Sequence, residues 1–558
     1  MPWFDAARQA IHELMETPDE QLGATESREA GPLELERLVR LPVLVAMAGL
    51  VGAVAGLGAY VFRAMIGLVH NLSFRGEIGL LYTATDPTPP SPWGVAVVAA
   101  PIVGAIGVVF LVQRFAPEAK GHGVPEVMEA IHYQGAVIRP IVALVKAVAS
   151  SISIGTGGAV GREGPIIQIG AAFGSTFGQR VGAGLSDRQV LVAAGSAAGI
   201  AATFDAPLGG VLFAIELLLI SVSARTILAV ASAVASAMTV SRPLLDETLA
   251  FDIPALHQVL PLELNIIDVA GLLVLGVLIG KTSVLLIRSI YGLEDRFTQW
   301  FANPYTRHIV GMTIVGFMMY GFLQWRGQYV IEGVSYATVQ EILRSAISDP
   351  WLLLVFAGAK VIATSLTLGS GASGGVFSPS LFVGAAIGAA LGNAAMVCGL
   401  AVDPAVFALA GMAAMIAGST GAVMTGIVMV AEMTGDYAIA VHLLIAAAVA
   451  TAVRKWLSSG SIYTEKLYRR GHWVPEGLEV LGSEGIRAED LMEALPADPS
   501  AVPRRIIPAD APVAVVLETL RTGRGAATVV GPEGRHVGII RREHLTASLS
   551  GRRRHPPE

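Results

Sequence analysis

Long uncharged apolar runs in the middle of the chain limit what it can fold into. Leu41–Phe62 and Gly94–Gln113 carry no charge, Val361–Val402 is also uncharged, and Pro404–Ala431 follows after a single aspartate. A helix needs about 20 apolar residues to cross a bilayer, so several of these runs can span it. Only 15% of the residues are charged, against about 25% in ordinary soluble domains. The runs predict an all-α polytopic membrane protein.

The two ends of the chain differ from its middle. Residues 1–40 are acidic and polar, and without a basic region followed by an apolar core they predict no cleavable signal peptide. We expect 41–470 to be the transmembrane domain, 471–486 a linker and 487–558 a water-soluble tail. The formal charge of −6 gives no reason to expect a nucleic-acid partner. Cys398 is the single cysteine, which excludes intrachain disulfides.

The transmembrane domain contains an internal repeat. Residues 155–178 share nine glycine, alanine and proline positions with residues 369–392, at an offset of 214 (369 minus 155). From Gly195 and Gly411 onward eight further positions match at an offset of 216 (411 minus 195), ending at a glutamate in each copy. Weak internal symmetry of this kind is typical of transporter folds.

Each repeat, roughly 41–250 and 260–470, carries a glycine cluster followed by a proline. Pro165 and Pro379 suit the first turn of a helix, and the glycines before them free the backbone from regular helix. In a membrane, broken helices are tolerated where the freed backbone groups line a cavity. Two helix N-termini converging near mid-membrane would bind a small anion, because both present unpaired N–H groups and a positive dipole end.

An adjacent charged pair, Arg162 and Glu163, lies inside the glycine-rich stretch GTGGAVGREGPIIQIGAAFG, Gly155–Gly174. Ionisable residues inside a membrane are costly, so they are functional by default. The alternative is structural, with the Glu163 carboxylate paired with Arg162 at a helix end.

Four ordered motifs resemble the CLC family of chloride channels and proton/chloride antiporters. They are GHGVPE at Gly121–Glu126, GREGP at Gly161–Pro165, GGVFSP at Gly374–Pro379 and SIYTEKL at Ser461–Leu467. The resemblance covers roughly residues 40–470. It implies an inverted-repeat helical bundle that transports chloride or a similar monovalent anion as a homodimer in the plasma (inner) membrane, with both termini cytoplasmic. We expect no enzymatic activity, no metal and no cofactor.

The resemblance also implies roles for individual residues. Glu163 resembles the gating glutamate, whose carboxylate competes with the anion. Val376 and Phe377 resemble backbone N–H donors from the second repeat, and Tyr463 resembles a phenol that donates to the central anion. Tyr463 has an alternative place in an interfacial aromatic belt. The other anion-binding candidates come from the two first-repeat motifs: His122, Gly123, Arg162 and Gly164.

His122 departs from the family pattern, which usually has serine at this position. Either the residue contributes only its backbone to the anion, or its ring donates and makes anion uptake pH-dependent.

Leu217 is a second departure, because many family antiporters carry a proton-transfer glutamate there. Glu216 is adjacent but points about 100° away on a helix. Because Glu216 and Glu432 occupy equivalent repeat positions, we favour structural hydrogen bonding for both over a proton pathway. We therefore expect a passive gated chloride channel, with a proton-coupled antiporter as the alternative. A remote alternative is an intramembrane serine protease, from GASGG at Gly371–Gly375 and His442.

The tail resembles a single CBS module. AATVV and HVGII around GPEGR predict two strands, and Ala511–Arg521 and RREHL predict helices. CBS modules of the family usually come as a tandem pair, and IRAEDLME at Ile486–Glu493 resembles a remnant of the approach to the first of them. With one copy we do not expect an adenine-nucleotide site, and contact with the dimer partner is the alternative role. The basic end GRRRHPPE either meets anionic lipid or is disordered.

Overall fold

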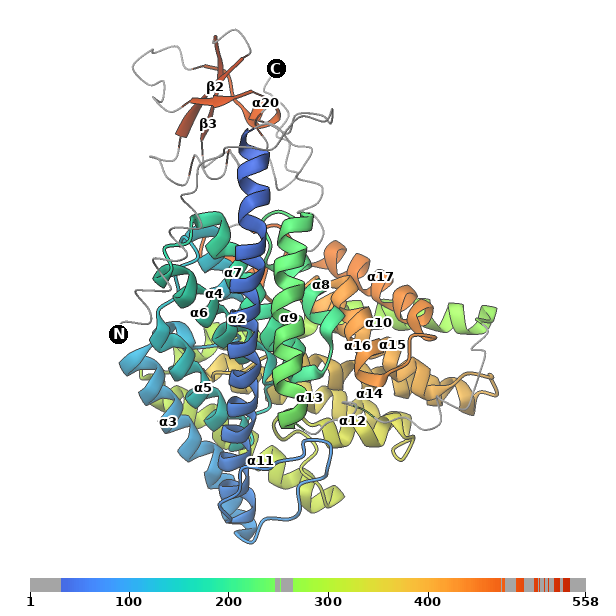
Figure 1. Cartoon of the computed structure of the whole chain (residues 1–558). Helices are drawn as coiled ribbons and strands as arrows, with labels where there is room; N and C mark the ends of the chain where they lie inside the picture. The colour runs from blue at the N-terminus through green and yellow to red at the C-terminus, as the bar shows by residue number, and fades with distance from the viewer. Residues whose placement is uncertain are drawn as a thin grey trace.

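The computed structural model describes residues 32–245, 251, 264–472 and 474–476, and in the tail 488–495, 506–509, 511, 516, 520, 526–531 and 535–541. Figure 1 shows a body of packed helices and a small sheet outside it. The first repeat contains α2 (Pro32–His70), η1 (Asn71–Arg75), η2 (Gly94–Val98), α3 (Ala99–Phe115), η3 (Pro117–Ala119), α4 (Val124–Tyr133), α5 (Pro140–Gly155), α6 (Glu163–Arg180), α7 (Leu185–Phe204), α8 (Pro207–Leu217) and α9 (Ala224–Leu245). The second repeat contains α10 (Ile266–Trp300), α11 (Pro304–Arg326), α12 (Tyr336–Leu343), α13 (Pro350–Ser370), α14 (Phe377–Val397), α15 (Pro404–Thr420), α16 (Val423–Thr434) and α17 (Ala440–Leu457), followed by α18 (Thr464–Arg469).

The helices confirm the expected membrane protein. Within the described residues, eight segments are long and apolar enough to cross a bilayer: Leu41–Arg75, Gly94–Phe115, Ala224–Leu245, Ile266–Trp300, Pro304–Arg326, Pro350–Ser370, Phe377–Val397 and Ala440–Leu457. The first of these helices begins at Pro32, before the expected boundary at residue 41.

The helix starts follow the repeat read from the sequence. Helices α6 and α14 begin at Glu163 and Phe377, which are 214 residues apart (377 minus 163). Helices α8 and α16 begin at Pro207 and Val423, 216 residues apart (423 minus 207). Both offsets equal those found by matching glycines and alanines, so the two halves share one order of helices.

Close helix crossings explain why the repeats keep glycine at matched positions. A Cβ added to Gly170 on α6 would lie 2.1 Å from the carbonyl oxygen of Gly195 on α7. In the second repeat, a Cβ at Gly384 on α14 would lie 2.3 Å from the carbonyl oxygen of Gly411 on α15. Any side chain at these positions would force the helices apart. Helices α7 and α15 are buried along most of their lengths and form the centre of the bundle.

The tail forms a small three-stranded sheet. The strands β1 (Ile506–Pro508), β2 (Ala526–Val530) and β3 (His536–Arg541) lie in that order, with β1 parallel to β2 and β2 antiparallel to β3. The two predicted runs are thus β2 and β3, whereas β1 was not predicted. A short helix, α20 (Ala488–Leu491), packs on the sheet through a shared apolar core. Arg541, the first residue of RREHL, ends β3 instead of starting a helix, because it pairs with Ala526 of β2. The rest of RREHL and the basic end lie outside the described residues, as does most of Ala511–Arg521.

Candidate anion site

Two glycine-rich loops, one from each repeat, meet through a pair of hydrogen bonds. The Gly161 N–H donates to the Gly375 carbonyl (2.8 Å), and the Gly375 N–H donates to the Gly161 carbonyl (2.7 Å). The two glycines are equivalent positions of the repeat, so this exchange is self-complementary, as around a two-fold axis. Helices α6 and α14 begin two residues later, which brings their N-termini together.

The Glu163 carboxylate lies at these joined N-termini. Its Oε1 accepts from the Ser378 hydroxyl and from the Tyr336 hydroxyl (3.2 Å), and the backbone N–H groups of Glu163 and Ser378 lie close enough to interact. A Cβ added to Gly161 would lie 1.9 Å from Glu163 Oε2, and one added to Gly375 would lie 2.8 Å from it. The carboxylate lies over both glycines, and at Gly375 a side chain would also meet the backbone nitrogen of Gly164 at 2.8 Å.

Arg162 has other partners than the neighbouring carboxylate. Its guanidinium lies over the Tyr336 ring, 5.5 Å from the centroid, and donates to the Thr203 carbonyl (3.3 Å). The alternative of a simple Arg162–Glu163 ion pair is therefore not the arrangement in the described part of the chain. The carboxylate is held by hydroxyl and backbone donors instead.

Two fully buried lysines, which the sequence analysis did not single out, brace the loops before α4 and α12. Lys146 donates to two carbonyls of the α4 loop (residues 119–123) at 2.7 and 3.0 Å. Lys360 donates to two carbonyls of the α12 loop (residues 331–335) at 2.8 and 3.1 Å and to the Ser335 hydroxyl at 2.7 Å. The lysines are 214 residues apart (360 minus 146), so a charge repeated within apolar helices could have revealed them.

His122 joins the α4 loop to α6 through its backbone. A Cβ added to Gly164 would lie 1.9 Å from the His122 carbonyl oxygen, so α6 meets this loop in close contact. The His122 ring stacks on Tyr291 with centroids 6.0 Å apart, and neither ring nitrogen bonds to a described protein group. Burial and the nearby Lys466 ammonium lower the pKa of His122 to about 3, so the ring is neutral at ordinary pH.

Tyr463 is buried immediately before α18, with 2% of its surface exposed. The Tyr463 phenol lies close enough to Glu163 for the carboxylate charge to act on it. The adjacent Ile462 carbonyl accepts the Tyr291 hydroxyl, which anchors the turn that carries Tyr463. The Tyr463 side chain is thus enclosed by protein and does not project from the surface of the bundle.

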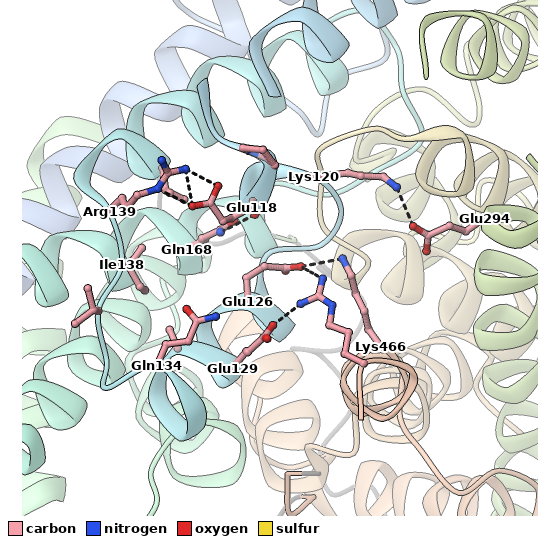
Figure 2. Close-up of a pocket in the computed structure, with 15 residues that line it drawn as sticks. Glu118, Lys120, Glu126, Glu129, Gln134, Ile138, Arg139, Gln168, Glu294 and Lys466 are labelled. Atoms are coloured by element: carbon pink, nitrogen blue, oxygen red, sulfur yellow. Dashed lines mark hydrogen bonds and ion pairs between the residues drawn. The ribbon is translucent and has the colours of Figure 1, made fainter. Parts of the chain in front are cut away.

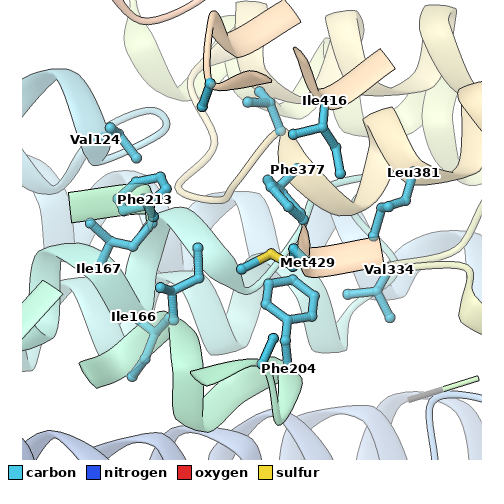
Figure 3. Close-up of a cluster of buried hydrophobic side chains, with 14 of the residues drawn as sticks. Val124, Ile166, Ile167, Phe204, Phe213, Val334, Phe377, Leu381, Ile416 and Met429 are labelled. Atoms are coloured by element: carbon cyan, nitrogen blue, oxygen red, sulfur yellow. The ribbon is translucent and has the colours of Figure 1, made fainter. Parts of the chain in front are cut away.

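The second-repeat candidates lie at the start of α14. Val376 precedes the helix and Phe377 is its first residue, so the first N–H groups there have no intrahelical acceptor. The Phe377 ring packs on Phe204 at the end of α7, with centroids 5.2 Å apart (Figure 3). The Phe377 side chain thus packs in the core, and only its backbone N–H is available to an anion at the N-terminus of α14. Gly123, in the same way, is the residue before α4.

Glu216 and Glu432 cap each other's helices. Glu216 accepts three hydrogen bonds from the first turn of α16, at 2.6–2.9 Å. Glu432 accepts two from the first turn of α8, at 2.7 and 2.9 Å. The symmetric pair therefore forms reciprocal helix caps, and Leu217 beside it is buried.

A charged cavity of about 570 Å³ lies beside α4 and α18 (Figure 2). Acidic and basic side chains alternate around it: Glu118, Lys120, Glu126, Glu129, Arg139, Glu294, Lys466 and Arg470. Burial alone would raise the pKa of Glu126, but its ion pairs with Lys466 (2.9 Å) and Arg470 (3.1 Å) lower it to about 2. Since α4 and α18 begin beside Gly123 and Tyr463, the cavity adjoins the elements that carry two anion-binding candidates.

Ser373 has partners that do not suit a nucleophile. Its hydroxyl donates to the Ala119 carbonyl (2.7 Å) and pairs with the Ser150 hydroxyl (2.9 Å). His442 lies in α17 and is not among the described partners of Ser373. The geometry gives the serine protease alternative no support.

The fold and the site together define a membrane-spanning, two-repeat protein with a candidate anion site where the N-termini of α6 and α14 meet. Residues 103–455 match the model of the family described as voltage gated chloride channel. The chain belongs to this family, the CLC family, and it transports chloride.

Curated relatives and solved structures agree with this assignment. The H(+)/Cl(-) exchange transporter ClcA of Vibrio parahaemolyticus is 32% identical over 464 residues, covering 80% of this chain and 92% of the relative. The ClcA of Vibrio cholerae is 33% identical over 434 residues, covering 75% and 88%. A slow cyanobacterial Cl−/H+ antiporter has a TM-score of 0.65 at 24% identity, covering 76% of this chain and 97% of its own. A eukaryotic CLC transporter has a TM-score of 0.65 at 20% identity, covering 92% and 98%. These two structures show the same fold.

Proposed function

We propose that this chain is a proton-coupled chloride exchanger, and not the passive channel that Leu217 led us to expect. Relatives that align with most of the chain are named as H(+)/Cl(-) exchange transporters, which favours the alternative. The expectation of a channel rested on a single position. The observation that carries the proposal is the Glu163 carboxylate at the joined N-termini of α6 and α14.

A carboxylate in this position can couple the two ions. Helix N-termini attract negative charge, so the ionised carboxylate and a chloride ion compete for the same donors. Protonation neutralises the carboxyl group, weakens its hold on these donors and lets chloride take its place. The Glu163 carboxyl group therefore binds a proton when chloride replaces it at these donors. Backbone donors at Gly123, Gly164, Val376 and Phe377, together with the Tyr463 hydroxyl, would bind the anion in turn.

The proton has to reach Glu163 by a route that avoids position 217. Leu217 has no titratable group, and the Glu216 carboxylate is occupied by the first turn of α16. Exchange in this chain therefore uses a different internal donor from the glutamate that many family antiporters have at this position.

Purified protein in proteoliposomes tests the proposal. An imposed chloride gradient should drive protons uphill, and the reversal potential should be smaller than the chloride Nernst value of about 59 mV per tenfold gradient. Glu163→Gln should abolish proton movement and remove the pH dependence of chloride flux. Glu77→Gln, which changes an exposed carboxylate, is the matched control and should behave as wild type. A full Nernst potential without proton movement would instead establish a passive channel.

We also propose a homodimer in the plasma (inner) membrane with cytoplasmic termini, as the family resemblance implies. Mass measurement of the detergent-solubilised protein tests the assembly, with twice the chain mass expected. Protease accessibility of tags at both termini in right-side-out and inverted vesicles tests the orientation, and cleavage only in inverted vesicles is expected.

A further inference from the structure

Tyr336 connects the second repeat to the Glu163 carboxylate. It is the first residue of α12, and only 1% of its surface is exposed. Its hydroxyl donates to Glu163 Oε1 (3.2 Å) and lies 2.7 Å from the Ser378 hydroxyl, which also bonds to Glu163. The sequence motifs did not point to this residue, because it lies outside all four of them.

The Tyr336 ring is fixed from several sides. The Arg162 guanidinium lies over one face of the ring, and the α12 loop that precedes it is braced by Lys360. Within that loop, Ser335 has a φ of 59°, in the left-handed region that non-glycine residues rarely adopt. The Ser335 hydroxyl accepts from Lys360 (2.7 Å) and donates to the Glu332 carbonyl (2.9 Å). These bonds hold the start of α12 and aim the phenol at the carboxylate.

We propose that Tyr336 is a positioning residue for the gate, whose hydroxyl holds the ionised Glu163 carboxylate in its blocking position. The inference rests on the proposed function of Glu163 and adds a determinant of the pH at which the gate opens. A hydroxyl that donates to a carboxylate stabilises its charged form over its protonated form. Tyr336 therefore favours the ionised, blocking state and opposes protonation and release.

Other polar groups also act on Glu163. The charges of Arg162 and Lys360 reach it, its own charge reaches Tyr463, and Ser378 bonds to it. The two cations also favour the ionised form and remain after Tyr336 is changed. Removing the Tyr336 hydroxyl should therefore move the titration of the gate without abolishing it.

Tyr336→Phe tests the proposal, since it removes the hydroxyl but keeps the ring under Arg162. The pH of half-maximal chloride flux in proteoliposomes should rise by about one unit, which corresponds to a tenfold change in the gate's proton affinity. Tyr329→Phe is the matched control. The Tyr329 hydroxyl accepts the Ser91 N–H (3.1 Å) at another buried position and does not contact Glu163, so this variant should keep the wild-type profile.

A double variant separates this inference from the proposed function. If Tyr336 acts through the carboxylate, Tyr336→Phe should have no further effect on the pH profile in a Glu163→Gln background. A normal profile in Glu163→Gln alone would reject the gate itself. Loss of pH dependence in Glu163→Gln, together with an unshifted profile in Tyr336→Phe, would reject only the role of Tyr336.

Ser378→Ala provides a second, smaller change in the same network. It removes the hydroxyl that contacts both Tyr336 and Glu163, so the profile should shift in the same direction. If Tyr336→Phe does not fold, as judged by size-exclusion chromatography, Tyr336→Leu, which also removes the hydroxyl, decides the question. An unshifted profile in folded Tyr336→Leu would overturn the proposal.

Discussion

The α4 loop and the α12 loop are the same structure made twice, yet they carry different chemistry. Gly121 and Gly333 are equivalent (an offset of 212, 333 minus 121), with φ angles of 79° and 50°. Gly123 and Ser335, two residues later, have φ angles of 91° and 59°. A buried lysine braces each loop from the helix that follows α4 or α12.

The side chains on these matched backbones differ. The first-repeat loop carries His122, whose neutral ring stacks on Tyr291, where the second-repeat loop carries Val334. Two residues after His122 and Val334, the first repeat has Val124 where the second has Tyr336. The Tyr336 hydroxyl donates a hydrogen bond to Glu163. Duplication therefore kept the backbone and its braces, while substitutions on the loops placed a phenol in the second repeat only. A symmetric scaffold thus acquired an asymmetric gate.

Removing the braces should have the largest effect and should test whether the two loops act independently. Lys146→Met and Lys360→Met each leave buried carbonyls without a donor, at a cost of about 3 kcal/mol of stability. Lys360→Met should cost more, because Lys360 has three acceptors and Lys146 has two. Thermal unfolding in detergent measures the difference, with the exposed Lys281→Met as control.

The brace variants should also differ in function. Lys360→Met should shift the pH dependence of chloride flux, because the α12 loop aims Tyr336. Lys146→Met should instead change the chloride/nitrate ratio, because the α4 loop contributes to the anion site. Identical functional changes in both variants would show that the loops do not have separate roles.

The reciprocal caps offer a smaller and symmetric test. Glu216→Gln and Glu432→Gln each replace a carboxylate whose two oxygens both accept hydrogen bonds with an amide. The NH2 group of the amide cannot accept, so it faces a backbone N–H without forming a bond. Each should lower stability by about 1–2 kcal/mol, measured by the same thermal unfolding. Neither should change the number of chloride ions exchanged per proton. If Glu216→Gln alone lost proton/chloride coupling, Glu216 would be part of the proton pathway, and the two glutamates would not have equivalent roles.

His122→Ser should have the smallest effect on flux. The variant should change the chloride/nitrate ratio if the ring touches the anion. It should leave the pH profile between pH 5 and 8 unchanged, because a ring with a pKa of about 3 is neutral throughout that window. A titration near pH 6.5 that disappears in the variant would contradict the neutral ring.

The same substitution has a consequence for stability. His122 has a folded-state pKa of about 3, below the value of about 6.5 for an unfolded histidine. The unfolded chain therefore takes up the proton first, and stability is lost as the pH falls from about 6.5 toward 3. His122→Ser should lose less stability than wild type between pH 7 and pH 5, which thermal unfolding at the two values measures.

The helical architecture could be predicted from the sequence, because the patterns that specify it are local or periodic. Apolar runs predicted the membrane helices, and matched glycines predicted the repeat, since close crossings such as that of Gly170 on Gly195 tolerate no side chain. The motif around Glu163 predicted a helix N-terminus with a carboxylate, and α6 begins at that residue. The passive-channel expectation depended on the single position Leu217, and the named relatives favour the antiporter alternative instead.

By itself the sequence determined a duplicated membrane bundle, with broken helices and a carboxylate in its glycine-rich breaks. Only the tertiary structure decided what surrounds that carboxylate. Tyr336 lies 173 residues from Glu163 along the chain, and their hydrogen bond exists only because the two repeats pack together. Each buried lysine finds its carbonyl acceptors within its own repeat, but on a loop 25–29 residues earlier in the chain. Local patterns specify helices and their ends, but the partners of a buried polar group come from distant segments, and packing alone selects them.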